Sequence, residues 1–290
     1  MKETYITTRD AAGLLGVTET TIKRWTDSNR LKCVKTLGGH RKYLMKDIEE
    51  FARENKIIIS GVTPPVKKEY MERLGYAVFT KNQDQIIEII LNESLKGNRD
   101  SLFDLFMYLT KNRVKFSNLV DEIVHPVMEI IGDMWHKNQI DIEQEHLASD
   151  TIKNSLSRLV VHLPHQRKNN TKVICACSEG EYHDMGLQAL AYDLELKGYA
   201  LHFLGANTPF RSIVKAVTNE KPKYVLVSAT YPSISQEEFI QGIKKTAKAA
   251  KANDAKLLVG GRFAQNFDKG TLGCDAIMNS IKEINSYLNK

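Results

Sequence analysis

The residues best suited to bind a ligand lie in one short segment, Glu181-Tyr182-His183-Asp184-Met185-Gly186. It follows the apolar run 173–177, which we predict to be a buried strand of a parallel sheet. Loops after such strands line the carboxyl edge, where doubly wound sheets bind ligands. His183 is a candidate metal ligand there, and the carboxylate two residues earlier can orient it. A loop histidine beside carboxylates is also commonly just solvated, so this segment alone leaves both interpretations open.

Two further segments fall at the same predicted edge. Ser228-Ala229-Thr230 follows Gly186 after 41 intervening residues, and Gly260-Gly261 ends the next apolar run. With the histidine segment they resemble the cobalamin-binding signature of B12 domains, which is Asp/Glu-x-His-x-x-Gly, Ser-x-Leu/Thr and Gly-Gly. The chain departs from it slightly, since Glu181 stands where Asp is commoner and the last spacing is long.

The resemblance implies a role for each matched position. His183 would be the lower axial ligand of cobalt, which accepts a neutral imidazole, and Glu181 would fix its tautomer. Gly186 would let the backbone approach the corrin. The remaining positions would hold the displaced nucleotide tail, with Ser228 and Thr230 donating hydrogen bonds and Gly260 and Gly261 leaving it room.

The first 58 residues carry a concentration of positive charge and the pattern of a winged helix-turn-helix. From Arg9 to Lys46 there are nine Lys or Arg residues against three Asp or Glu. A capping box at 7–10 begins one helix, Thr18 caps a second over 19–28, Gly38-Gly39 turns a hairpin, and Asp47 caps a third helix. The second helix of such a unit enters the major groove of DNA. The residues expected to contact DNA are Thr20, Thr21, Lys23 and Arg24 on that helix and Arg41 and Tyr43 on the wing.

The same segment resembles the DNA-binding head of MerR-type regulators. The pattern is Thr8-x-x-Ala11-Ala12-x-Leu14-x-Gly16-Val17-x-x-x-Thr21-Ile22-x-x-Trp25, then Gly38-Gly39-His40-Arg41-x-Tyr43 and Asp47-Ile48. The resemblance implies binding to a double-stranded DNA operator. The alternative is a helical module that binds another protein.

A third group of residues lies in a helical region. Trp135-His136 ends one predicted helix, and Glu145-His146 falls in the first turn of the next, which Asp141 and Gln144 cap. Taken singly, Trp135 is more simply a core residue, and Glu145 and His146 are surface residues. Beside the B12 signature, Trp-x9-Glu-His resembles the upper-face cap of CarH/LitR-type photoreceptors, which are adenosylcobalamin-dependent members of the MerR family.

That second resemblance implies a light switch. Trp135 would stack on the adenosyl group, Glu145 and His146 would hydrogen-bond it, and His136 would ligate cobalt after light removes it. It also implies a homo-oligomer, a tetramer in the dark that holds DNA and represses, which becomes smaller after light. A ligand stabilises an assembled state only by its differential affinity for that state.

The elements that must position these residues divide the chain into three folded parts. We expect a winged helix-turn-helix over residues 1–58, a linker over 59–69 marked by Gly61 and Pro64-Pro65, a four-helix bundle over 70–165 and a Rossmann-like doubly wound parallel sheet over 170–290. The fold class is therefore multidomain, α and α/β.

Composition excludes several other classes. The 290 residues carry a formal charge of +6, and no apolar run approaches the about 18 residues that span a bilayer. We expect a cytoplasmic protein without membrane contact. The four cysteines form no paired Cys-x-x-Cys spacing, and neither a Gly-x-Gly-x-x-Gly nor a Walker loop occurs.

The favoured hypothesis is a light-responsive, adenosylcobalamin-binding transcriptional repressor that is not an enzyme. The first alternative is a regulator that senses the abundance of cobalamin with little or no light response. The second is a corrinoid carrier for a methyltransferase or part of a mutase, although no segment of about 250 residues remains for a substrate barrel.

Overall fold

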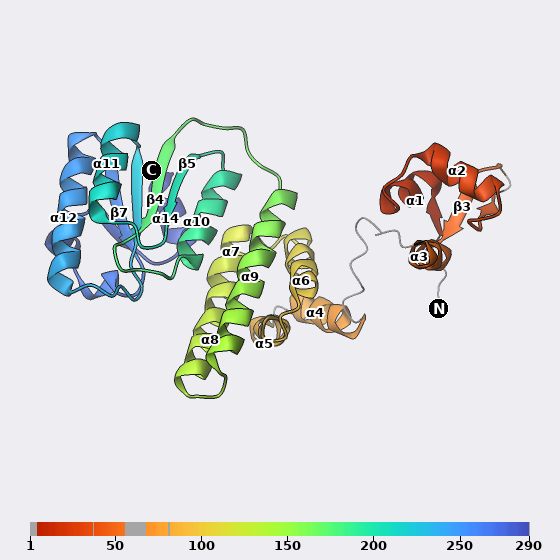
Figure 1. The fold of residues 1–290 in the computed structure, drawn as a ribbon, viewed down its shortest axis with the longest axis horizontal. Coiled ribbons are helices and arrows are strands. Elements are labelled where there is room, and N and C mark those ends of the chain that lie inside the picture. Colours follow the sequence, from red (N-terminus) through yellow and green to blue (C-terminus); the bar gives the residue numbers. More distant parts are fainter. Residues whose placement is uncertain (1–4, 37, 56–67, 81, 290) are drawn as a thin grey trace. The chain divides into compact units, whose positions relative to one another are not determined.

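The computed structural model describes residues 5–36, 38–55, 68–80 and 82–289 (Figure 1). Contacts between Cα atoms group the chain into two compact units, Met1–Glu69 and Tyr70–Lys290. The expected end of the first domain at residue 58 and the expected linker up to residue 67 lie outside the described residues. The expected bundle and sheet domains both fall within the second unit.

The N-terminal unit has the expected helix-turn-helix and hairpin. A capping box between Thr7 and Asp10 starts the first helix, and the Thr18 hydroxyl caps the second. The third helix begins at Met45, so Asp47 lies in its first turn and does not cap it, contrary to our expectation. The elements are β1 (Tyr5–Thr7), α1 (Thr8–Leu14), α2 (Glu19–Asp27), β2 (Val34–Lys35), β3 (Arg41–Leu44) and α3 (Met45–Glu54).

Strand β1 was not expected from the sequence. It pairs antiparallel with β3, which also pairs with β2, so the wing hairpin becomes a sheet in the order β1-β3-β2. The buried side chains of Ile22, Tyr43 and Ile48 join the second helix, the wing and the third helix in one core.

The second unit begins with the expected helical region. Asn82 and Asn98 cap two of its helices through their side chains. Its elements are α4 (Lys68–Thr80), α5 (Gln83–Leu95), α6 (Arg99–Lys111), α7 (Phe116–Leu119), the π-helical turn η1 (Val120–Val124), α8 (His125–His136) and α9 (Ile142–His162). Helices α7, η1 and α8 follow one another without a break and form one continuous helical segment. Together with α5, α6 and α9 this segment makes the four expected helices, and α4 is an additional one.

The rest of the second unit is a parallel five-stranded sheet in the order β5-β4-β6-β7-β8. Its strands are β4 (Lys172–Cys177), β5 (Ala200–Gly205), β6 (Tyr224–Ser228), β7 (Lys256–Gly260) and β8 (Ala276–Met278). The register pairs Cys177 with Ser228 and Ser228 with Gly260. The three signature segments therefore follow neighbouring strand ends, as the parallel arrangement predicts.

Helices cover both faces of this sheet (Figure 1). Helices α11 and α12 pack on one face through a core that includes Phe210, Phe239 and Ile243, while α10 contacts β4 and β5. The helices are α10 (Met185–Leu196), α11 (Phe210–Glu220), α12 (Gln236–Ala252), α13 (Lys269–Leu272) and α14 (Ile281–Leu288), with a short turn η2 (Ala264–Asn266). Among the described residues, none of the helices combines the length and apolar character needed to cross a membrane.

Helix α14 connects the sheet domain to the helical region. The Asp121 carboxylate of η1 accepts hydrogen bonds from the backbone N–H groups of Ile281 and Lys282, both at 3.0 Å. The Lys282 ammonium also pairs with Glu122. A carboxylate at a helix N-terminus satisfies N–H groups that have no partner within the helix.

Candidate functional site

The loop after β4 is organised around the carboxylate of Glu181, which is fully buried. One carboxylate oxygen accepts two hydrogen bonds from His183, from the backbone N–H and from Nδ1, each at 2.7 Å. The other oxygen accepts the backbone N–H groups of Thr230, by a short contact, and of Tyr231 at 2.6 Å. The loop after β4 is thereby bonded to the loop after β6, which joins two of the signature segments.

The pKa values of this pair follow from the contacts. Burial alone would raise the pKa of Glu181, but the hydrogen bonds from His183, Tyr231 and Thr230 outweigh it and hold the pKa below its ordinary value. The hydrogen bond to Glu181 raises the pKa of His183, against desolvation, and the charges of Glu181, Glu145 and Asp184 act in the same direction. Glu181 is therefore a carboxylate at neutral pH.

The contacts of His183 leave one ring nitrogen free to bind a ligand. Since Nδ1 donates to Glu181, the neutral ring carries its lone pair on Nε2, and 62% of the side chain is exposed. The Tyr231 ring lies beside the imidazole, with ring centroids 5.4 Å apart and the two ring planes at 69°. A nitrogen donor with a fixed tautomer and an open face suits cobalt.

Two further observations fit a large group at this edge. A Cβ built at Gly186 would meet nothing within 4 Å, so the backbone there is open to a ligand. The hydroxyl of Ser178 is buried next to the site and has no hydrogen-bond partner, and such groups in native proteins call for an explanation. The donor set and the open backbone therefore fit a corrinoid above His183.

The remaining signature positions lie at the same edge. Ser228 and Thr230 are half-buried, and the Thr230 backbone is the part bonded to Glu181. A Cβ on Gly260 would approach the Met278 carbonyl oxygen to 2.6 Å, and one on Gly261, whose φ is +93°, would approach the Ala229 carbonyl oxygen to 2.3 Å. The close packing between the strand ends therefore requires glycine at both positions. That these glycines also leave room for a nucleotide tail remains a proposal.

One face of α9 is directed at the His183 loop. Glu145, Ser149 and Lys153 recur at intervals of four residues, so they share that face. The Ser149 hydroxyl donates to Glu145 at 2.7 Å, and the Lys153 ammonium bonds both oxygens of Asp184 at 2.8 and 3.0 Å. Because Asp184 adjoins His183, this ion pair links the bundle to the loop that carries the histidine.

The other expected upper-face residues lie around the turn between α8 and α9. The rings of Trp135 and His136 are 4.8 Å apart, and both side chains are exposed, Trp135 by 41%. His146 is also exposed, with Nε2 3.6 Å from a Glu145 oxygen. Among the described residues, no hydrogen bond, ion pair or ring contact joins Trp135, His136, Glu145 or His146 to the His183 loop, and the charge of Glu145 contributes to the raised pKa of His183.

Asn207, after β5, was missed by the sequence reasoning although it holds the loop from its other side. Its side chain accepts from the Gly180 N–H at 2.8 Å and donates to the Tyr182 hydroxyl at 3.0 Å, and its N–H donates to the Glu181 carbonyl at 2.6 Å. Its φ of +45° lies in the left-handed region, which Asn tolerates better than most residues. An Asn in a loop after a strand is too common to have signalled this role.

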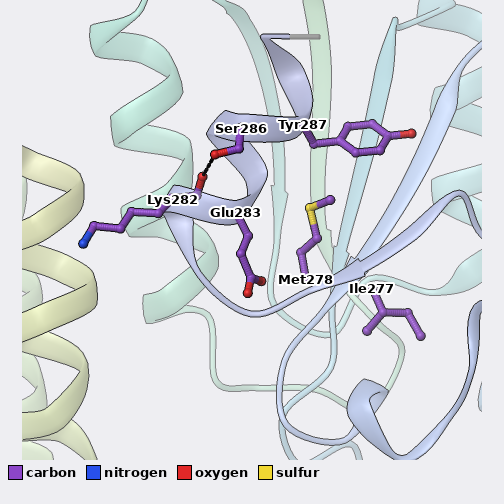
Figure 2. A pocket seen from close by; sticks show the side chains of 6 residues that line it. All are labelled: Ile277, Met278, Lys282, Glu283, Ser286 and Tyr287. Carbon is purple, nitrogen blue, oxygen red and sulfur yellow. Dashed lines mark hydrogen bonds between the residues drawn. The ribbon is translucent and has the colours of Figure 1, made fainter.

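A separate hollow of about 390 Å³ lies between β8 and α14 (Figure 2). Its lining residues are Ile277, Met278, Lys282, Glu283, Ser286 and Tyr287. None of the sequence-predicted site residues lines it, so it does not belong to the site around His183.

In the N-terminal unit, α2 presents the expected polar face. Thr20, Lys23 and Arg24 are exposed, whereas Thr21 is half-buried and its hydroxyl lies 3.0 Å from that of Thr18. The arrangement leaves a basic helix face available for a DNA groove.

The wing differs from our expectation. Tyr43 is fully buried, and its hydroxyl lies 3.1 Å from that of Thr26, so it cannot grip a phosphate; it is a core residue. Arg41 bonds the Asp27 carboxylate at 2.7 Å and the Lys23 carbonyl at 3.0 Å. Arg41 therefore joins the wing to α2.

Comparison with known proteins agrees with this division. The family model "Helix-turn-helix domain" matches residues 5–56, and two family models described as "B12 binding domain" match residues 83–159 and 171–280. The bundle and the sheet domain are thus each matched by a cobalamin-binding model.

Similar proteins fall into two groups. The HTH-type transcriptional repressor CarH of Myxococcus xanthus is 30% identical over 129 residues, 44% of this chain and 42% of that protein. The repressor CarA of the same organism is 23% identical over 261 residues, 83% of this chain and 82% of that protein. The trimethylamine corrinoid protein of Methanosarcina barkeri is 23% identical over 201 residues, 67% of this chain and 83% of that protein.

A solved structure shares the fold of the second unit. The monomethylamine corrinoid protein of Methanosarcina barkeri aligns with a TM-score of 0.56 and 19% identity, covering 71% of this chain and 97% of that one. The matched models and the geometry around His183 together identify the chain as a helix-turn-helix domain joined to a helical and a Rossmann-like B12-binding domain.

Proposed function

We propose that the protein is a transcriptional repressor that binds adenosylcobalamin and is released from DNA by light. The observation that carries the proposal is the combination, on one chain, of an exposed basic helix in a helix-turn-helix unit with a His183 oriented by a buried carboxylate. Similarity to two repressors named CarH and CarA supports the regulatory part.

The DNA part of the proposal rests on α2. Thr20, Lys23 and Arg24 would face the major groove, and Arg41 would hold the wing against α2 while the domain contacts phosphates. Lys and Arg contacts to phosphate release counterions, so DNA affinity would fall steeply with salt.

The cofactor part rests on the two B12-binding domains. His183 would ligate cobalt from the sheet side, with Glu181 keeping the proton on Nδ1. Trp135, His136, Glu145 and His146 would form the opposite wall from the bundle side. Bound adenosylcobalamin would supply a cobalt–carbon bond that light breaks, which makes it a candidate light sensor.

Coupling between the two parts would pass through α9. This helix carries Glu145 at the site and bonds the His183 loop through Lys153 and Asp184. A ligand held between the bundle and the loop would favour one position of α9, and its loss would remove that bias. The homo-oligomer, a tetramer in the dark, would assemble through the second unit. Its dissociation would then release DNA.

The test combines DNA binding, mass and light. The protein would select its own sites from random-sequence duplexes in the dark with adenosylcobalamin, and binding and mass would be measured before and after green light. We expect tight binding in the dark and a smaller, weakly binding form after illumination, with His183→Ala unresponsive. Equal mass and affinity after verified photolysis would refute the light switch and favour a sensor of cobalamin abundance, the first alternative.

A second candidate function has a specific observation in its favour. The bundle and sheet unit aligns over nearly all of a monomethylamine corrinoid protein, which is compatible with a carrier of corrinoid for methyl transfer. A carrier has no use for an exposed basic recognition helix. Absence of sequence-selective DNA binding in every cofactor state, together with His183-dependent corrinoid binding, would favour the carrier.

A further inference from the structure

We propose that Arg262 and Tyr231 form a binding site for the phosphodiester of the cofactor's nucleotide tail, and that this pair selects complete cobalamins over corrinoids that lack the tail. The proposal rests on the cobalamin binding proposed above, and it adds two residues that belong to no part of the sequence signature. It starts from the position of both residues at the carboxyl edge, where Tyr231 directly follows Thr230 and Arg262 directly follows Gly260-Gly261.

The backbone holds the two residues in place. The Tyr231 N–H donates to Glu181 at 2.6 Å. The loop that carries Arg262 is tied to the loop that carries Tyr231, because the Ala229 N–H donates to the Gly260 carbonyl at 2.9 Å and the Phe263 N–H donates to the Ala229 carbonyl at 3.1 Å. The two side chains are therefore presented from one cross-linked pair of strand ends.

The side chains form an uncompensated set of donors. Arg262 Nη1 donates to the Tyr231 hydroxyl oxygen at 3.0 Å, and both side chains are exposed. Among the residues that the structure describes, no carboxylate pairs with the Arg262 guanidinium. A phenol that accepts one guanidinium N–H still has its own proton to donate, and the guanidinium keeps further N–H groups. Such a planar cationic fork suits a phosphate oxygen pair.

The position relative to His183 identifies the anion. The Tyr231 ring lies beside the His183 imidazole, with centroids 5.4 Å apart, so the donors are carried by a residue that adjoins the histidine proposed to ligate cobalt. When a histidine replaces the lower base of a cobalamin, the nucleotide tail is displaced on that same side. The tail carries one phosphodiester, the negatively charged group of the cofactor, whereas the other peripheral groups of the corrin are neutral amides.

The test compares two ligands and five proteins. Adenosylcobalamin and adenosylcobinamide share the corrin and the adenosyl group, but the second lacks the phosphodiester and the base. Dissociation constants for both ligands would be measured in the dark with wild type, Arg262→Gln, Arg262→Lys and Tyr231→Phe. Arg211→Gln, which changes another exposed arginine of the same unit, serves as the matched control.

We expect Arg262→Gln to weaken adenosylcobalamin binding by about 10- to 100-fold, the loss typical of a charge-assisted hydrogen bond, and to leave adenosylcobinamide binding unchanged. Tyr231→Phe should have a smaller effect in the same direction, Arg262→Lys should retain part of the affinity, and Arg211→Gln should bind both ligands like wild type. Equal weakening of both ligands by Arg262→Gln, or no weakening of either, would overturn the proposal.

Failure of the underlying function is separable from failure of this site. The Co(II) form of the wild-type complex should show nitrogen splitting from a protein imidazole, and Arg262→Gln should keep it. If wild type lacks that splitting, the proposed ligation by His183 fails and this inference fails with it. If the splitting is present and the two ligands respond alike to Arg262→Gln, only the phosphodiester site is wrong.

Discussion

Replacement of Glu181 by Gln tests whether one buried carboxylate organises the candidate site. Each oxygen of the carboxylate accepts two N–H groups, from His183 on one side and from Thr230 and Tyr231 on the other. An amide has one oxygen, so either orientation of Gln places its NH₂ against two donors. If the NH₂ faces His183, it donates to Nδ1 and shifts the ring proton to Nε2, which then cannot ligate a metal.

The expected loss of stability follows from those contacts. A buried donor left without an acceptor costs about 1–3 kcal/mol, and Glu181 is fully buried, so we expect the unfolding free energy of the second unit to fall by about 3 kcal/mol. For a unit of this size the melting temperature should fall by about 6–12 °C.

Tryptophan fluorescence can report this unit alone. The chain has two tryptophans, Trp25 in the first unit and Trp135 in the second, so Trp25→Phe leaves Trp135 as the probe of urea unfolding. In that background Glu195→Gln, an exposed position of α10, should change stability by less than about 0.5 kcal/mol. If Glu181→Gln is no more destabilising than this control, the carboxylate does not hold the loop as argued.

Three further predictions concern other parts of the chain. Asn207→Gly keeps the left-handed backbone but removes the side-chain hydrogen bonds to Gly180 and Tyr182. The loss of one or two hydrogen bonds should weaken His183-dependent corrinoid binding by about tenfold in a titration. Unchanged affinity would contradict a role of Asn207 in holding the loop. Burial raises the pKa of Cys175 and Cys177 to about 12. Both thiols should therefore stay protonated and resist alkylation at about pH 8, near the ordinary thiol pKa, until the protein unfolds. Alkylation of either cysteine in rapidly labelled native protein, detected by mass spectrometry, would contradict this prediction. Arg24→Ala should reduce DNA affinity, and a salt dependence shallower by about one unit would indicate a phosphate contact, whereas relaxed sequence preference would indicate a base contact.

The sequence predicted where the site lies because the geometry of parallel sheets is restrictive. Strand ends in such a sheet meet at one edge, so residues after three separate apolar runs had to come together, as the register of Cys177, Ser228 and Gly260 shows. The same reasoning could not find the partners of Glu181 on the loop after β6, since they are backbone N–H groups. Every non-proline residue carries one, so they leave no mark in the sequence.

The wing shows the limit of pattern reading in a short strand. Alternation predicts which residues share a face, but in the strand 41–44 it does not tell which face meets the core. We assigned Arg41 and Tyr43 together to DNA, and the structure buries Tyr43 in the core and bonds Arg41 to Asp27. Helix α14 was missed for a different reason: Ile281, Ile284 and Leu288 have helical spacing, but eight residues at the chain end are too few for a firm periodicity.

Two of the polar attachments between bundle and sheet bear on how a bound ligand could be sensed. Lys153 and Asp184 form a partly exposed ion pair, and such pairs contribute about 0–1 kcal/mol. Asp121 accepts two N–H groups at the start of α14, a contact worth about 0.5–2 kcal/mol by analogy with helix caps. A ligand whose binding free energies to two arrangements of bundle and sheet differ by a few kcal/mol could therefore outweigh either attachment alone. Because the weaker attachment adjoins His183, a change of ligand would act first on α9, while the Asp121 contact can persist as the pivot.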